Sequence, residues 1–254
     1  SAGVSGSAGV SGSAGVSGSA GVSGLSEAAS GKHDTIITLN HSFHGRTITT
    51  LAATGQEAFH KSFLPLTGGF EYAEPGDLAF IERRASEGRL AAVMFEVVQG
   101  EGGVIPLDGG YVRALADLAK KYDFLLIADE VQTGNGRTGE YFAYMHHGIS
   151  PDIVTTAKGL GGGLPIGATL LGEKVAEVFS PGTHGSTFGG NPVVCAGALS
   201  IVSRIDDKLL DKVRKMSDYI ISELSGAKGV SGVSGMGLML GIATERPAFE
   251  VIAE

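Results

Sequence analysis

From residue 25 onward, the chain alternates short apolar runs with segments of helical periodicity. Apolar or β-branched runs of four to eight residues predict buried strands, whereas apolar residues spaced three and four apart predict helices. The strand-like runs are Thr35–Leu39, Ala91–Val98, Phe124–Ala128, Ile153–Ala157, Ile166–Leu171 and Leu238–Ile242. The helix-like segments are Gly76–Glu87, Tyr111–Tyr122, a helix beginning at Glu173, and Asn191–Leu224, a long helical stretch that allows a break.

The strand-like runs are mainly apolar or β-branched, without regular polar alternation. Such strands are typical of parallel sheets that are covered on both faces. We therefore expect an α/β fold in which a mainly parallel sheet is sandwiched by helices. The site of such a sheet lies at the carboxyl ends of its strands. Asp129 and Lys158 each follow an apolar run, so we expect them at neighbouring strand ends, facing one crevice.

Residues 1–24 are four copies of Ser-Ala-Gly-Val-Ser-Gly and hold 8 of the 41 glycines in the chain. The repeat has no charge, no aromatic ring and no residue larger than valine, so it cannot offset its ordering entropy by burial. It also lacks the basic start and the apolar stretch of a signal peptide. We interpret it as a low-complexity linker or as a stand-in for unassigned residues.

Composition narrows the function classes. A hydrophobic content of 43% argues against general disorder, and a net charge of −8 without a basic run argues against nucleic-acid or membrane binding. No segment is apolar enough to span a membrane, and the uncharged run Gly185–Ser203 reads as buried loop and helix. The single cysteine, Cys195, excludes an internal disulfide and favours a reducing, cytoplasmic location; we expect it to pack as a small hydrophobe.

Lys158 is the first candidate for chemistry. A lysine just beyond a buried strand can be desolvated, which lowers its pKa and frees an amine for Schiff-base formation. The alternative is a solvated lysine that opens a loop. The glycine run Gly159–Gly163 offers backbone N–H groups to a phosphate, but no Gly-Lys-Ser/Thr ends it, so the Walker pattern is absent.

Other polar residues have open roles at this stage. The Asp129 carboxylate can hold a metal, act as a base or pair with a cationic cofactor nitrogen, or it can simply cap a helix. The segment from Phe43 to Arg46 combines an aromatic plane, the imidazole of His44 and a guanidinium that can grip a carboxylate, or it is a surface turn. His41 and His44 are too few for a metal site, and none is predicted. The pair Ser186–Thr187 precedes a helix and can bind an anion.

Seven motifs in order carry a resemblance to a known family. They are Ser42–Thr47 (SFHGRT), Phe95–Gly103 (FEVVQGEGG), Asp129–Gly134 (DEVQTG), Gly136–Gly139 (GRTG), Ser150–Ile153 (SPDI), Ala157–Gly159 (AKG) and Gly185–Pro192 (GSTFGGNP). With these motifs, the chain from Leu39 to Pro192 resembles the class III, fold type I aminotransferases, which use pyridoxal phosphate. Within the family it most resembles the acetylornithine and ornithine branches.

The resemblance implies roles at the cofactor. Lys158 would form the Schiff base and then shuttle protons, and Asp129 would pair with the pyridinium nitrogen and keep it protonated. Phe43 would stack on the cofactor ring, with His44 in the same cofactor site. Gln132 would hydrogen-bond the phenolic oxygen.

The resemblance also implies roles toward substrates and a partner subunit. Arg46 would bind a substrate carboxylate. Glu101 would be a gate carboxylate that pairs with a second arginine and so lets one site accept both substrates. Ser186 and Thr187 would bind the phosphate of the neighbouring subunit's cofactor, which implies a homodimer with shared active sites.

The ends of the chain depart from the family pattern. The family's N-terminal region, with its phosphate-binding loop, would lie where the repeat stands, and the partner arginine of Glu101 would lie beyond Glu254. The resemblance therefore implies a pyridoxal-phosphate-binding large domain at residues 25–224. Residues 225–254 would be the start of a truncated C-terminal small domain that is largely absent.

The implied function is transfer of an amino group from N-acetylornithine, or ornithine, to 2-oxoglutarate in arginine biosynthesis. The partners would be small amino acids and 2-oxo acids. Three alternatives stay open: an inactive or partial fragment that at most binds the cofactor, another class III member acting on GABA or succinylornithine, and an aminomutase of the same fold type. The Gly136–Gly139 segment favours the aminotransferase branch over the aminomutase.

Overall fold

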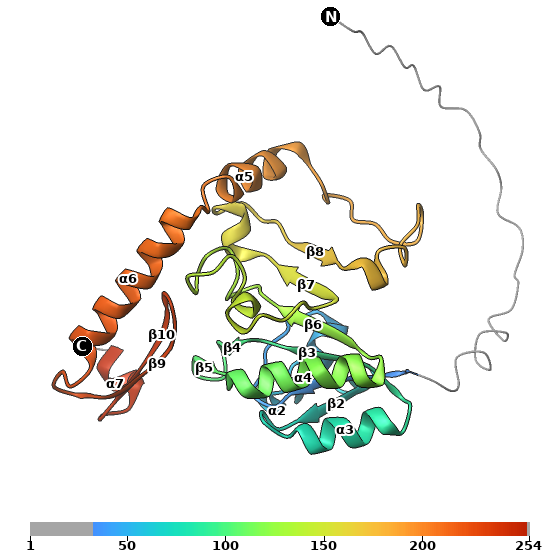
Figure 1. Ribbon diagram of the computed structural model, residues 1–254, viewed down its shortest axis with the longest axis horizontal. Helices are drawn as coiled ribbons and strands as arrows, with labels where there is room; N and C mark the ends of the chain where they lie inside the picture. Colours follow the sequence, from blue (N-terminus) through green and yellow to red (C-terminus); the bar gives the residue numbers. More distant parts are fainter. Residues whose placement is uncertain (1–32, 253–254) are drawn as a thin grey trace, which may run out of the picture. The chain divides into compact units, whose positions relative to one another are not determined.

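Most of the predicted strands form one six-stranded sheet in the computed structural model, which describes residues 33–252 (Figure 1). The strand order is β2-β1-β3-β6-β7-β8, and every neighbouring pair is parallel except β7–β8. The strands are β1 (Thr35–Leu39), β2 (Phe70–Ala73), β3 (Leu90–Phe95), β6 (Leu125–Asp129), β7 (Ile153–Thr156) and β8 (Ala168–Leu171). The expected mainly parallel α/β sheet is confirmed. The repeat at residues 1–24 lies outside the described residues.

Helices of very different length connect and cover the strands. The α-helices are α1 (Ile48–Ala53), α2 (Glu57–His60), α3 (Leu78–Ser86), α4 (Gly109–Tyr122), α5 (Pro192–Val202), α6 (Asp207–Leu224) and α7 (Ala248–Ile252), and the 3-10 turns are η2 (Ala143–His147), η3 (Lys158–Gly161) and η4 (Glu173–Val175). The carboxylates of Asp77 and Asp108 accept the N–H groups of Phe80 and Tyr111 and so cap α3 and α4. Within residues 33–252, no helix is long and apolar enough to cross a membrane.

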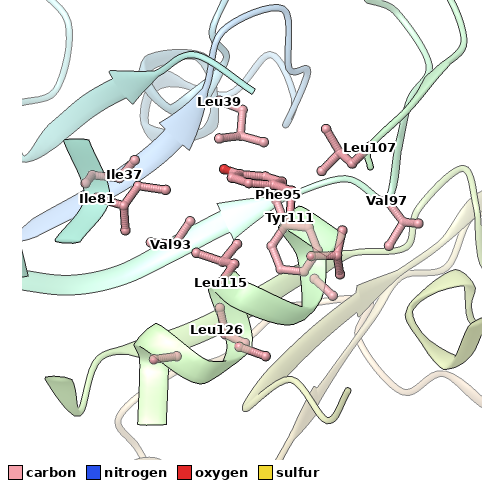
Figure 2. Packing of buried hydrophobic residues seen from close by; sticks show 14 of the residues in the cluster. Ile37, Leu39, Ile81, Val93, Phe95, Val97, Leu107, Tyr111, Leu115 and Leu126 are labelled. Carbon is pink, nitrogen blue, oxygen red and sulfur yellow. The ribbon is translucent and has the colours of Figure 1, made fainter. Parts of the chain in front are cut away.

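The core lies between the sheet and α4 (Figure 2). Phe95 and Val93 of β3 are fully buried against Leu115 of α4, and each such side chain contributes about 1.5–3 kcal/mol by leaving water. Ala92, which points to the opposite face of β3, is also buried. The centre of the sheet is therefore covered on both faces, as its unbroken apolar sequence predicts.

Four expectations for the region after β8 are wrong or only partly right. The stretch predicted as one long helix divides into α5 and α6, each capped by an N-terminal side chain, Asn191 or Asp206. The helix expected from Glu173 is only the short turn η4. The segment 185–190 is exposed rather than buried, and Cys195 is exposed rather than packed. Apolar composition predicted burial over 185–203, but residues 33–252 bury only part of α5, at Val194 and Ala198.

Two small hairpins complete the fold. β4 (Val98–Gln99) pairs with β5 (Ile105–Pro106), and β9 (Val230–Met236) pairs antiparallel with β10 (Met239–Thr244), which contains most of the predicted run at 238–242. Sequence reasoning missed β9 because its glycines and serines have low strand propensity. Gly237 in the β9–β10 turn has φ +60°, and a Cβ there would lie 2.5 Å from the Arg137 carbonyl oxygen. This tip therefore packs directly on the segment that follows β6. The domain boundaries after residues 24 and 224 remain predictions.

Candidate active site

Four neighbouring strands deliver the predicted site residues to one edge of the sheet. β1 leads to Phe43 and His44, β3 leads to Glu96, β6 ends at Asp129, and β7 leads to Lys158. These strands are parallel, so their carboxyl ends share that edge. The expectation that Asp129 and Lys158 lie at neighbouring strand ends is confirmed.

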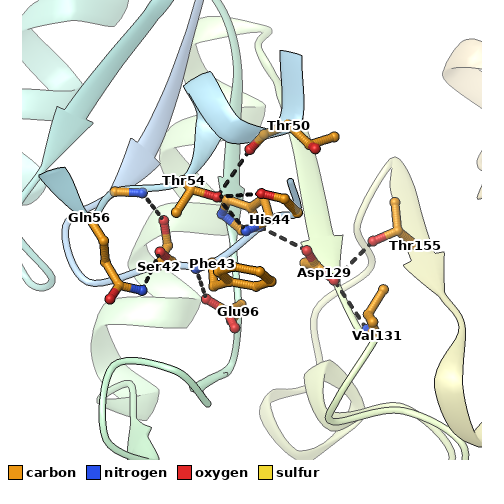
Figure 3. Close-up of polar contacts among 12 residues, drawn as sticks. Ser42, Phe43, His44, Thr50, Thr54, Gln56, Glu96, Asp129, Val131 and Thr155 are labelled. Atoms are coloured by element: carbon orange, nitrogen blue, oxygen red, sulfur yellow. Dashed lines mark hydrogen bonds and ion pairs between the residues drawn. The ribbon is translucent and has the colours of Figure 1, made fainter. Parts of the chain in front are cut away.

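Asp129 is buried and held by three donors (Figure 3). Its Oδ1 accepts the N–H of Val131 at 3.1 Å and the hydroxyl of Thr155 at 3.2 Å. Its Oδ2 lies 2.8 Å from Nδ1 of His44, whose side chain is fully buried. The element that follows Asp129 is the 3-10 turn η2, which begins only at Ala143, so the carboxylate caps a turn and not the start of an α-helix. The imidazole fixes the direction in which the carboxylate points.

Phe43 and Arg46, in the same segment as His44, are more exposed than the Asp129–His44 pair. The Phe43 ring meets Phe59 edge to face, with centroids 5.6 Å apart. The Arg46 guanidinium lies 4.7 Å from the Phe59 centroid and 5.7 Å from that of Phe43. Cation–π contacts of this kind orient a guanidinium and leave its N–H groups able to bind an anion.

Lys158 forms part of the wall of a cavity of about 290 Å³. The lining residues are Val131, Gln132, Gly134, Asn135, Arg137, Lys158, Gly159, Leu238 and Met239. Gln132 also donates from Nε2 to Oε1 of Glu101 at 3.3 Å, which brings the predicted gate carboxylate to the rim. Asp129 does not line this cavity, so the expectation that both strand-end residues face one crevice is met here by Lys158 alone.

Lys158 has an unusual backbone for a residue with a side chain. Its φ is +44°, in the left-handed region that costs energy for residues other than glycine. Asn135 holds the end of β7, just before Lys158. Its Nδ2 donates to the Thr156 hydroxyl at 2.9 Å and to the Ala157 carbonyl at 3.3 Å. The neighbouring structure therefore holds Lys158 in a conformation that it would not choose alone.

Sequence reasoning missed the far wall of the cavity. Leu238 lies in the β9–β10 turn and Met239 begins β10, and the Leu238 N–H donates to the Arg137 carbonyl at 2.9 Å. Val131 lies within the motif Asp129–Gly134, and Asn135 lies between that motif and Gly136–Gly139, but the sequence pattern predicts no role for either. A contact between residues so far apart in the chain has no local sequence signal.

Ser186 and Thr187 are not brought to the cavity. Both are exposed, in the segment between η4 and α5, and neither lines the cavity of Lys158. Asn191 caps the first turn of α5 by accepting the Val194 N–H at 3.1 Å. The role of Ser186 and Thr187 in binding phosphate at the site of a neighbouring subunit stays a prediction.

Glu96 is a buried carboxyl at the centre of this edge. Burial raises its pKa from 4.5 to about 7, against the opposing effects of His44 and the Phe43 N–H. Because this value lies above that of the unfolded chain, the folded protein keeps a proton that the unfolded chain has released. The free energy of unfolding therefore falls as pH rises from about 4.5 to about 7, the range in which the buried group becomes charged in the folded state.

Glu130 holds the turn behind Asp129 in place. Its side chain is fully buried and accepts the Thr133 hydroxyl at 2.5 Å and the N–H groups of Ala143 at 3.0 Å and Tyr144 at 2.9 Å. Burial raises the pKa of this carboxyl, and these three donors oppose the rise. The residue next to Asp129 is thus a structural clamp between the end of β6 and η2.

We expect Glu130→Ala to lower the free energy of unfolding by roughly 3 kcal/mol or more, because each buried donor left without an acceptor costs about 1–3 kcal/mol. Urea denaturation followed by circular dichroism measures this. The matched control is Glu140→Ala, which removes a half-exposed carboxylate 3.6 Å from Arg214 and should cost less than about 0.5 kcal/mol. Equal losses in the two variants would contradict the clamp.

Comparison with known proteins gives a consistent set of relatives. The sequence profile described as "Aminotransferase class-III" matches residues 11–253. Acetylornithine aminotransferase of Haemophilus ducreyi is 51% identical over 208 residues, which are 82% of this chain and 53% of that protein. The Bacillus subtilis enzyme of the same name is 45% identical over 235 residues, 91% of this chain and 60% of that protein. This chain thus spans little more than half the length of these relatives.

Solved structures agree with the sequence matches. The crystal structure of the ornithine aminotransferase from Toxoplasma gondii superposes with a TM-score of 0.78 at 34% identity and covers 83% of this chain and 52% of that one. N-acetylornithine aminotransferase from Stenotrophomonas maltophilia gives a TM-score of 0.68 at 35% identity, with 85% and 52% covered.

Proposed function

Because the chain belongs to the class-III aminotransferases, we propose that it forms part of an enzyme that moves an amino group from N-acetylornithine, or ornithine, to 2-oxoglutarate in arginine biosynthesis. The names of the relatives support this choice of donor. One structural observation carries the proposal: Lys158 and Asp129 lie at neighbouring strand ends, with the lysine on the wall of a cavity. Such a transfer requires an amine that can act as a base, as Lys158 can, and an oriented carboxylate, as Asp129 has.

The residues of this edge fit pyridoxal phosphate, the cofactor on which class-III aminotransferases depend. Lys158 offers an amine for a covalent bond to an aldehyde, and Asp129 offers a carboxylate already oriented by three donors. His44 Nε2 is buried without a hydrogen-bond partner among the described residues, so the polar edge is incomplete as it stands. Phe43 presents an aromatic ring at the same edge.

When bound, the cofactor acts as an electron sink that stabilises negative charge on the substrate carbon. The protein residues supply the rest. Lys158 would bind the cofactor through Nζ and then carry a proton to and from the substrate carbon. Asp129 would hold a proton on the ring nitrogen, because its Oδ2 is fixed by His44 and its Oδ1 by Val131 and Thr155.

Two further residues would select and admit the substrates. Arg46 is exposed and held by two aromatic rings, so its guanidinium is presented to a substrate carboxylate. Glu101 accepts from Gln132 at the cavity rim, which suits the gate role that we propose for it. Gln132 would in turn orient the cofactor's phenolic oxygen.

The proposal is tested by mixing the chain with pyridoxal phosphate and each of four donors: N-acetylornithine, ornithine, succinylornithine and GABA. The expected result is a change in cofactor absorbance that is fastest with N-acetylornithine or ornithine, followed by glutamate formation when 2-oxoglutarate is added. A faster reaction with GABA or succinylornithine would show that this compound, and not N-acetylornithine or ornithine, is the amino donor. Absorbance that responds to no donor would leave a chain that at most binds the cofactor.

We also propose that the protein is a homodimer in which Ser186 and Thr187 bind the phosphate at the partner's site. Neither residue lines the cavity of its own chain, and large apolar side chains that follow them in the chain are exposed: Phe188, Val193 and Leu199. A second subunit would cover these side chains and bring the two hydroxyls to a cofactor.

Light scattering of the chain with pyridoxal phosphate is expected to give the mass of a dimer. Thr187→Ala should weaken cofactor binding about tenfold, because a hydrogen bond to a charged phosphate is lost. Thr183→Ala, in the same exposed segment, is the control and should bind normally. A monomer that binds the cofactor as tightly as the dimer would overturn the shared site.

A further inference from the structure

The segment after β1, which contains Phe43 and His44, has to cross the end of β3 to reach Asp129. β3 lies between β1 and β6 in the sheet, yet His44, which follows β1, contacts Asp129 at the end of β6. Neighbouring strands are about 4.8 Å apart, so the crossing spans roughly 10 Å. Glu96, the first residue after β3, therefore lies in the path of the crossing.

Glu96 and Thr54 hold the crossing from two sides (Figure 3). Oε2 of Glu96 accepts the N–H of Phe43 at 2.9 Å, and the Thr54 hydroxyl accepts the N–H of His44 at 3.0 Å. The backbone of Gly100, in the loop after β4, also hydrogen-bonds the Glu96 carboxyl and lowers its pKa. Glu96 is only 4% exposed and is thus shielded from water that would compete for these bonds.

We propose that Glu96 is a positioning residue: its carboxylate ties the Phe43 backbone to the end of β3 and so sets the Phe43 ring and the His44–Asp129 pair for the cofactor. The cofactor part of this inference rests on the proposed function. The tie itself concerns only residues of this chain. Glu96 acts through Phe43 and His44 and is given no contact with the reacting atoms.

The charge state of Glu96 makes the tie dependent on pH. The titratable groups that act on it are His44, from the crossing segment, and Asp129, from β6. Its pKa of about 7 means that the carboxyl is largely protonated at pH 6 and largely ionised at pH 8. A hydrogen bond from an N–H group to a carboxylate is stronger than one to a neutral acid. The hydrogen bond from Phe43 to Glu96 should therefore strengthen as pH rises through 7.

The first experiment uses the chain without cofactor. In ¹H–¹⁵N NMR spectra recorded from pH 5.5 to 8.5, the Phe43 amide should shift with a midpoint near 7, and Glu96→Gln should remove that midpoint. Glu82→Gln, which changes a partly exposed carboxylate paired with Lys121, is the control and should leave it unchanged. A flat Phe43 amide in the wild type, or the same midpoint in Glu96→Gln, would overturn the tie.

The second experiment measures pyridoxal phosphate affinity at pH 6 and pH 8. The wild type should bind more tightly at pH 8, whereas Glu96→Gln should bind about tenfold more weakly at pH 8 and lose the pH dependence. If Glu96→Gln does not fold, Glu96→Asp keeps the charge but withdraws it from Phe43, and it should show the same loss of affinity.

The outcomes separate the two proposals. A wild type that takes up no cofactor, while its Phe43 amide titrates as expected, would reject the proposed function and keep the tie. Normal affinity and an unchanged pH profile in folded Glu96→Gln, or Glu96→Asp where Glu96→Gln does not fold, would reject the positioning role and keep the function.

Discussion

Lys158→Ala is expected to abolish the cofactor's protein-linked absorbance and to lower transamination by about 10⁴–10⁶-fold, as loss of a covalent catalyst does in other enzymes. Lys158 lines the cavity and follows β7, the strand next to the one that ends at Asp129. Absorbance spectra with pyridoxal phosphate and a glutamate-forming assay measure the two effects.

The matched control is Lys120→Ala, which removes an exposed lysine from the outer face of α4 and should change neither quantity. Added methylamine should partly restore turnover in Lys158→Ala, because a free amine can stand in for the missing one. Spectra identical to those of the wild type would mean that Lys158 only opens the loop before the glycine run.

Asp129→Asn is expected to cost turnover several powers of ten while leaving the fold largely intact. Each power of ten corresponds to about 1.4 kcal/mol in the barrier. Asparagine keeps an oxygen for Val131 and Thr155, but it cannot hold a proton on a ring nitrogen as a carboxylate does. Steady-state kinetics and urea denaturation separate the effect on turnover from the effect on stability.

Asp152→Asn is a fair control for that change. Asp152 also accepts a backbone N–H, that of Leu126 at 2.8 Å, but it lies before β7 and therefore at the opposite edge of the sheet. It should lower stability without a matching loss of turnover. Near-native turnover in Asp129→Asn would reduce Asp129 to the turn cap that its Val131 contact also allows.

The sequence predicted the part of the site that depends on strand ends. Apolar runs that end at Asp129 and Lys158 were enough, because parallel strands bring their carboxyl ends to one edge. It did not predict that His44 would reach Asp129 past β3, nor that Leu238 would face Lys158, because both contacts join residues distant in the chain. The left-handed backbone of Lys158 likewise depends on neighbours such as Asn135.

The sequence also misjudged burial around α5. Its apolar composition indicates removal from water, but composition does not say which surface provides the cover. Val193 and Leu199 stay exposed within the described chain, and Cys195 with them. A pattern of apolar residues therefore predicted helical structure here, but it did not predict how much of α5 stays exposed.

The position of the β9–β10 turn has a consequence for synthesis of the protein on the ribosome. The sheet edge with Phe43, Asp129 and Lys158 is complete once β7 and the first residues after it have emerged, but Leu238 and Met239 follow much later in the chain. At ~5–20 residues per second, the delay is roughly several seconds. During that interval a nascent chain has Lys158 in place before Leu238 and Met239 can close the cavity around it, so, if the proposed function holds, the cofactor would find its widest entrance while translation is still under way.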